Sequence, residues 1–160
     1  MKLIKWLVGV IALCAIALFL INSLKSGDDR LLIQEALDES IRASREGKPG
    51  GVLENISVNF RFNDSELATR GDIGQYVKSM RPDVVVLHRE PTISGDTAKI
   101  VTDVKVKFKL GPIESEQKVD NVVITFQREN GTKFGIIPTK KWRIVTVSAP
   151  TFDPAATLNN

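Results

Sequence analysis

Few residues of the kinds that build covalent or metal-dependent sites occur in this sequence. Cys14 is its one cysteine and His88 its one histidine. An intramolecular disulfide is therefore excluded, and a structural zinc site lacks ligands. The sequence contains no glycine-rich phosphate loop, paired-cysteine motif or calcium-binding loop. We therefore expect no cofactor and no metal.

Most of the chain also carries no net charge. The sequence has 22 Lys and Arg against 19 Asp and Glu. Lys2, Lys5 and Lys25 lie in residues 1–27, which contain no acid. Without these three lysines, 19 basic residues face 19 acidic ones. The net charge of the body gives no reason to expect a nucleic-acid partner.

Residues 6–24 predict a membrane anchor. This stretch is apolar except for Asn22 and Ser23, and a helix over it would be about 28 Å long, close to the roughly 30 Å of a bilayer core. A cleaved signal peptide fits less well, because the apolar core is longer than such signals have. A lipoprotein signal also fits less well, because Leu13, and not a small residue, precedes Cys14.

The charges beside this span suggest its orientation. Lys2 and Lys5 precede it, whereas Lys25 and Arg30 follow it. Short cationic N-termini usually stay in the cytoplasm. We expect a single-pass protein of the inner or plasma membrane whose body lies outside the cytoplasm.

The longest strand pattern covers residues 97–110. Apolar and polar side chains alternate along it, as they do in a strand with one covered and one wet face. The apolar face contains Ala98, Ile100, Val104, Val106, Phe108 and Leu110. The polar face contains Thr97, Lys99, Asp103, Lys105, Lys107 and Lys109. A strand of this length, about 45 Å, needs a cover for its apolar face.

A helix is predicted ahead of the strands. Ser26 and Asp29 have the spacing of a capping box, and Gly47 with Pro49 ends the pattern. Its buried stripe is expected to contain Ile33, Leu37, Ile41 and Ser44, reinforced by Leu32, Ala36 and Ser40.

The remaining elements are a second helix and further strands. A strand is expected over residues 56–63, and Thr69 to Asp72 predicts the cap of a helix that Pro82 closes. The further strands cover residues 84–93, 119–128 and 142–148. Pro91 suggests an edge or a bulge in the first of them. A polar connection is predicted over residues 111–118 and a turn at residues 130–131.

This order predicts an α+β domain over residues 28–149, followed by a disordered tail over residues 150–160. The strands are expected to form a curved antiparallel sheet that helices cover on one face.

Three segments resemble the nuclear transport factor 2-like superfamily, whose α+β fold is cone-shaped. Residues 69–77 resemble its short helix after the first strand, residues 93–100 its hairpin, and residues 141–145 its terminal Trp-bearing strand. Residues 132–140 depart from the family pattern, in which a short turn precedes the Trp strand. The resemblance implies either an assembly domain, as in membrane-tethered members, or a ligand pocket or an isomerase or cyclase activity inside the cone.

An enzyme of this fold would need acid or base groups inside the cone. The weak catalytic candidates are Tyr76, His88 and Asp103. A core tyrosine, a structural histidine and a cross-strand charge partner explain these three residues more simply. The sequence does not place the three on a shared face, so no acid–base pair is predicted. The candidate pocket residues are Tyr76, Met80, Phe108 and Trp142.

Two groups of residues are candidates for partner contacts. The first is Lys105, Lys107 and Lys109, and the second is Phe134, Ile136 and Ile137. Exposed lysines also keep a sheet soluble, and the second segment can equally extend a strand or pack onto the core. The sequence favours a membrane-anchored, non-catalytic interaction or assembly domain, with a protein partner or a homodimer. The alternative is an apolar ligand in the cone, which would have to be open.

Overall fold

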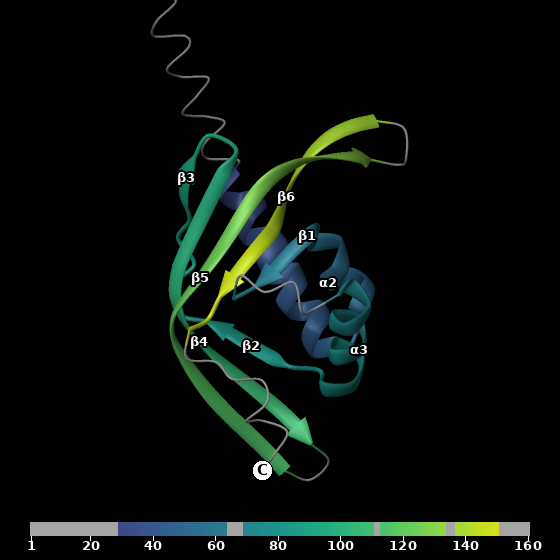
Figure 1. The fold of residues 1–160 in the computed structure, drawn as a ribbon, viewed down its shortest axis with the longest axis vertical. Helices are drawn as coiled ribbons and strands as arrows, with labels where there is room; N and C mark the ends of the chain where they lie inside the picture. Colours follow the sequence, from purple (N-terminus) through teal and green to yellow (C-terminus); the bar gives the residue numbers. More distant parts are fainter. Residues whose placement is uncertain (1–28, 64–68, 111–112, 134–136, 151–160) are drawn as a thin grey trace, which may run out of the picture.

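The computed structural model describes residues 29–63, 69–110, 113–133 and 137–150 (Figure 1). The predicted membrane span of residues 6–24 and residues 151–160 of the predicted tail lie outside this part. In the described ranges, no helix is both long and apolar enough to cross a membrane.

A helix over residues 29–46 begins the described chain. Ile33, Leu37 and Ser40 lie on its buried stripe, as predicted. Gly47 ends it with a φ of +68°, a left-handed conformation that glycine adopts without steric cost. Pro49 does more than stop this helix, because it begins a second one, α2 (Pro49–Asn55). No helix was predicted over these residues, although proline favours the first turn of a helix.

The third helix, α3 (Arg70–Met80), starts at the predicted cap. The Thr69 hydroxyl accepts a hydrogen bond from the Asp72 backbone N–H, and the Asp72 carboxylate accepts one from the Thr69 backbone N–H. This capping box satisfies two N–H groups that the first turn of a helix leaves without partners. Arg81, in the left-handed conformation, ends the helix.

Six strands form one curved sheet in the order β1-β6-β5-β4-β2, and β3 also pairs with β4. The strands are β1 (Ile56–Phe62), β2 (Asp83–Val86), β3 (Thr92–Ser94), β4 (Thr97–Leu110), β5 (Ile113–Lys133) and β6 (Ile137–Ser148). The bounds of β4 are those predicted. The sheet is mixed and not antiparallel throughout, because β1 runs parallel to β6.

Other sequence expectations about the strands were wrong. Residues 113–118 are not a connection but the start of β5, where Glu114 and Glu116 lie opposite Lys109 and Lys107 of β4. Residues 130–131 are not a turn, since β5 pairs with β6 as far as Lys133 and Ile137. The β-rich run over residues 84–93 is divided into β2 and β3, with Pro91 between them.

A β-bulge interrupts the pairing of β4 with β5. Thr102 lies opposite Val122, but Val104 lies opposite Val119, so β5 has one residue more than β4 between these pairs. Asn121 adopts a φ of +56° at this point. Its backbone N–H donates to Asp103 Oδ1 at 3.1 Å. A bulge bends its strand and increases the local twist.

The bulge also determines which side chains of β5 face the helices. Side chains alternate along a strand, so Val119 and Val122 would lie on opposite faces of a regular strand. Both are buried here, because the extra residue of the bulge brings both side chains to the same face of the sheet. The helices cover only this concave face of the sheet (Figure 1). The core between the two layers includes Ile33, Leu37, Ile100, Ile124, Phe126, Trp142 and Ile144.

We predict that Asn121→Val lowers the free energy of unfolding by about 1–2 kcal/mol, because a β-branched residue tolerates the left-handed backbone much less well than asparagine does. Denaturant unfolding of the full chain measures this change. Asn121→Gly is the matched control and is expected to be tolerated, because glycine readily adopts a positive φ. Equal losses in both variants would contradict a backbone origin.

Candidate functional site

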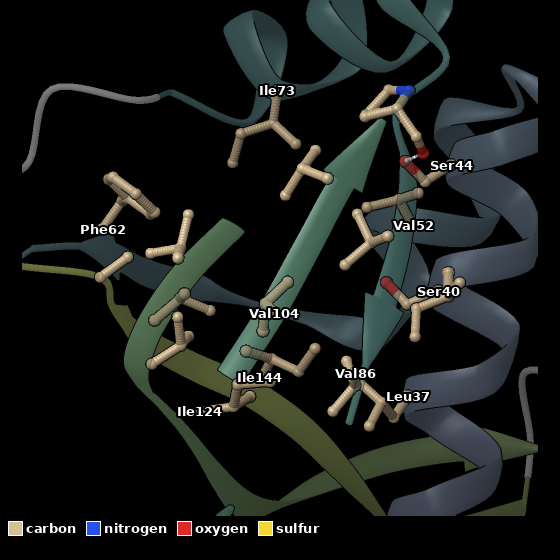
Figure 2. A pocket seen from close by; sticks show the side chains of 18 of the residues that line it. Leu37, Ser40, Ser44, Val52, Phe62, Ile73, Val86, Val104, Ile124 and Ile144 are labelled. Carbon is tan, nitrogen blue, oxygen red and sulfur yellow. Dashed lines mark hydrogen bonds between the residues drawn. The ribbon is translucent and has the colours of Figure 1, made fainter. Parts of the chain in front are cut away.

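A cavity of about 640 Å³ lies between the helices and the concave face of the sheet (Figure 2). Every layer of the fold contributes to its wall, including the helix over residues 29–46, α2, α3 and five strands. Its apolar lining consists of Leu37, Ile41, Val52, Phe62, Ile73, Pro82, Val84, Val86, Val104, Val106, Phe108, Val119, Val122, Ile124, Ile144, Val147 and Ala149. The side chains of the described residues therefore leave the cone open.

Four polar side chains interrupt this apolar lining. Ser40 and Ser44 belong to the helix over residues 29–46 and are each 8% exposed. Asp72 and Tyr76 belong to α3, lie one helical turn apart and are both exposed. The cavity therefore has a buried polar pair on one wall and an exposed polar pair at its rim.

The two buried serines differ in their hydrogen bonds. The Ser44 hydroxyl donates to the carbonyl oxygen of Pro82 at 3.0 Å (Figure 2). Ser40 points into the cavity (Figure 2), and among the described residues its hydroxyl has no hydrogen-bond partner. A helical serine commonly bonds a carbonyl of the preceding turn, as Ser79 does with Gln75 at 2.8 Å. Ser40 is therefore one polar group of the cavity that is free to meet a ligand.

Tyr76 and Asp72 determine the chemistry of the rim. Tyr76 is 41% exposed, and the partial burial of the rest of the side chain raises its pKa to about 12. Its ring meets Phe108 edge-on at 6.5 Å between centroids. Hydrogen bonds from the Thr69 side chain and backbone lower the pKa of Asp72. At neutral pH the rim therefore holds a neutral phenol and an ionised carboxylate.

The structure does not bring the three catalytic candidates together. Tyr76 lines the cavity, whereas His88 is exposed and its backbone N–H donates to Thr102 Oγ1 at 2.9 Å. Asp103 lies on the outer face, where Lys118 pairs with it at 3.3 Å. The backbone N–H of Asn121, and then Lys118, lower the pKa of Asp103. Asp103 therefore belongs to the bulge and not to the cavity.

Two of the four pocket candidates lie on the cavity wall and two do not. Tyr76 and Phe108 line the cavity. Met80 and Trp142 are not among its described lining residues. The Trp142 indole N–H donates to Asp29 Oδ1 at 3.0 Å. The Arg128 guanidinium lies 4.8 Å from the centre of the Trp142 ring and forms an ion pair with Asp29. Trp142 thus fastens the start of the first described helix to the sheet.

The candidates for partner contacts are only partly described. Lys105 and Lys107 lie 3.7 Å and 3.2 Å from the carboxylate of Glu116 on β5, so they form cross-strand charge pairs. Phe134 and Ile136 lie outside the described residues, as do the side chains of Lys109 and Ile137. Contacts through these four residues stay a prediction.

Sequence reasoning missed Ser40 and Ser44 as site residues. It placed both on the buried stripe of their helix but gave neither a role. The signal was a polar side chain at a core position, because buried polar groups usually need a partner. In the described ranges, no cluster of three or more His, Cys, Asp or Glu side chains could hold a metal ion.

The fold is similar to solved nuclear transport factor 2-like structures. An NTF2-like protein with a cystatin-like fold from Novosphingobium aromaticivorans is 17% identical and superposes with a TM-score of 0.60, covering 87% of this chain and 93% of its own. An NTF2-like superfamily protein from Salmonella enterica serovar Typhimurium is 12% identical, with a TM-score of 0.58 and coverage of 79% and 94%. The resemblance seen in the sequence is confirmed for the fold.

A third similar structure is the CaMKII hub of S. rosetta, which is 15% identical, with a TM-score of 0.54 and coverage of 73% of this chain and 92% of that one. No family model and no curated protein matches the sequence. Identities this low establish a shared fold and leave function to be argued from the site.

We predict that Tyr76 ionises with a midpoint near pH 12 in the folded chain and near pH 10, about the ordinary value, when unfolded. Tyr76 is the one tyrosine of the sequence, so tyrosinate absorbance reports it alone. The unfolded chain then loses its proton first, and Tyr76 reduces stability as pH rises from about 10 to about 12. A folded midpoint near pH 10 would contradict the partial desolvation of this phenol.

Proposed function

We propose that this domain binds a small apolar molecule in the cavity and does not transform it. The open cavity is the observation that supports this function most strongly. Its volume of about 640 Å³ is within the range of about 300–1,000 Å³ typical of small-molecule sites. An apolar wall with a few polar groups is also typical of such sites. The open cone favours the ligand alternative over the assembly domain that the sequence favoured.

The polar groups at the cavity support binding without catalysis. General acid–base chemistry works best when the pKa of the group is near the working pH. Tyr76 has a pKa of about 12. The Asp72 carboxylate is ionised and already accepts a hydrogen bond from the Thr69 N–H in the cap of α3. Neither His88 nor Asp103 faces the cavity. No described pair of residues there combines an acid with a base.

The proposed setting of this domain is a membrane, with residues 6–24 as its anchor and the body outside the cytoplasm. The apolar length of this stretch and the lysines before it are the support. Little chain separates the stretch from the helix over residues 29–46. An anchor of this kind would keep the cavity close to a membrane surface.

The function is tested by filling the cavity. Val104 is 5% exposed and points into it (Figure 2). We predict that Val104→Phe abolishes binding of an apolar molecule and preserves the fold, because the larger ring occupies empty space instead of displacing packed atoms. Native mass spectrometry of the full chain, released from lipid nanodiscs, measures the bound adduct.

Val101→Phe is the matched control, because Val101 lies on the outer face of the same strand and is 62% exposed. The wild-type chain and Val101→Phe should carry the adduct, and Val104→Phe should not. An adduct of equal intensity in all three chains, or in none of them, would contradict the proposal.

Self-association is a second candidate function. Val101, Leu87 and Val85 expose 62%, 45% and 38% of their surfaces. The Leu87 backbone N–H bonds the carbonyl of Asp103, which is two residues along β4 from Val101. Exposed apolar groups of this kind can mark protein contacts. A structure of the same fold is described as a hub. Phe134, Ile136 and Ile137 stay the proposed contacts in the region after β5.

Light scattering of the full chain in nanodiscs separates the two functions. If the outer face mediates self-association, Val101→Glu should convert a dimer to a monomer without loss of the bound adduct. A wild-type chain that is already monomeric would remove self-association as a candidate.

A further inference from the structure

The polar groups of the cavity restrict the class of its ligand, an argument that rests on the proposed function. The first restriction is charge. Asp72 is the one charged residue among the described lining residues. None of these described lining side chains is a cation that a negatively charged ligand could pair with.

An anionic group would meet two penalties in this cavity. An ion that leaves water without a counter-charge pays its full desolvation cost. At the rim it would also pass the ionised carboxylate of Asp72, whose like charge repels it. Fatty acids and anionic phospholipid headgroups are therefore poor ligands for this cavity, although their chains match its apolar wall.

The second restriction is the hydrogen-bonding pattern of the two serines. The Ser44 hydroxyl has already donated its proton to the Pro82 carbonyl, so toward the cavity it can only accept. The Ser40 hydroxyl has no partner among the described residues and can donate or accept. The two residues lie one turn apart on one helix, with Cβ atoms about 5–6 Å apart, so a single ligand atom can reach both.

A hydroxyl group is the ligand group that fits both serines at once. It can accept a hydrogen bond from Ser40 and donate one to Ser44. A ketone or an ester can accept from Ser40 but leaves the Ser44 oxygen without a donor. We infer that the cavity selects an uncharged, apolar alcohol, whose hydroxyl bonds Ser40 and Ser44 and whose hydrocarbon part lies against the wall formed by β4, β5 and β6.

Three probes of equal chain length test this inference: 1-decanol, 2-decanone and decanoate. The full chain is held in an amphipathic polymer, and calorimetric titration at pH 8 measures the affinity of each probe. Val104→Phe provides the baseline for probe that partitions into the polymer. We expect the affinity to fall from 1-decanol to 2-decanone to decanoate, with about a tenfold or larger difference between the first and the last.

Ser40→Ala is expected to weaken 1-decanol binding by about three- to tenfold, the value of one hydrogen bond between uncharged groups. It should not reduce stability, because the hydroxyl that it removes has no partner within the described chain. Ser79→Ala is the matched control, since Ser79 is an exposed helical serine outside the cavity. This control should bind 1-decanol as the wild type does.

The outcomes separate the two proposals. Binding of decanoate as tight as that of 1-decanol, or equal behaviour of Ser40→Ala and Ser79→Ala, would overturn the selection of an alcohol and leave ligand binding intact. If no probe binds the wild type better than it binds Val104→Phe, the proposed function itself is wrong.

Discussion

The bulge between β4 and β5 is the constraint on which the cavity depends. The sheet bends there because Asn121 takes a left-handed conformation and its N–H bonds the Asp103 carboxylate. The same point also holds the chain directly after β2, since the Asp103 carbonyl accepts a hydrogen bond from the Leu87 N–H. A flat sheet could pack closely against the helices. A bent one leaves space at the centre of the concave face, and this space is the cavity.

A second set of contacts fixes the helix that closes this space. Asp29, at the start of the first described helix, accepts from the Trp142 indole and pairs with Arg128. At the other end of the same helix, Ser44 bonds the Pro82 carbonyl ahead of β2. Both ends of the helix are thus tied to the sheet or its connections, while the middle of its buried stripe, which includes Ser40, faces the cavity. This arrangement presents a polar atom to a space that is otherwise apolar.

The sequence predicted most elements of the fold because their signals are local. The alternation in β4 and the capping box of α3 depend on residues within one strand or one turn, and both were confirmed. The start of β5 was missed, because its charged residues look like a polar connection until the lysines that face them on β4 are known. The bulge was also missed, since only the pairing of two strands makes a valine at 119 and one at 122 share a face. Local patterns do not encode such pairings.

The site was harder to predict than the fold, because a cavity is a volume that several elements enclose. Sequence reasoning looked for acids and bases, and so it considered Tyr76, His88 and Asp103. The informative residues were two serines on the apolar stripe of a helix. Whether these serines are core residues or site residues depends on their distance from the opposite wall, and this distance follows from the bend of the sheet. The charge of the ligand could be argued only once the lining residues were identified.

The central claim is that a ligand lies inside the bent sheet, and contacts between protons of the ligand and of the wall test it most directly. Nuclear Overhauser effects would be measured between 1-decanol and methyl groups of the full chain. We expect contacts with Val104, Ile124 and Ile144, which line the cavity. Contacts confined to exposed methyl groups such as those of Val101 and Leu31 would contradict the claim.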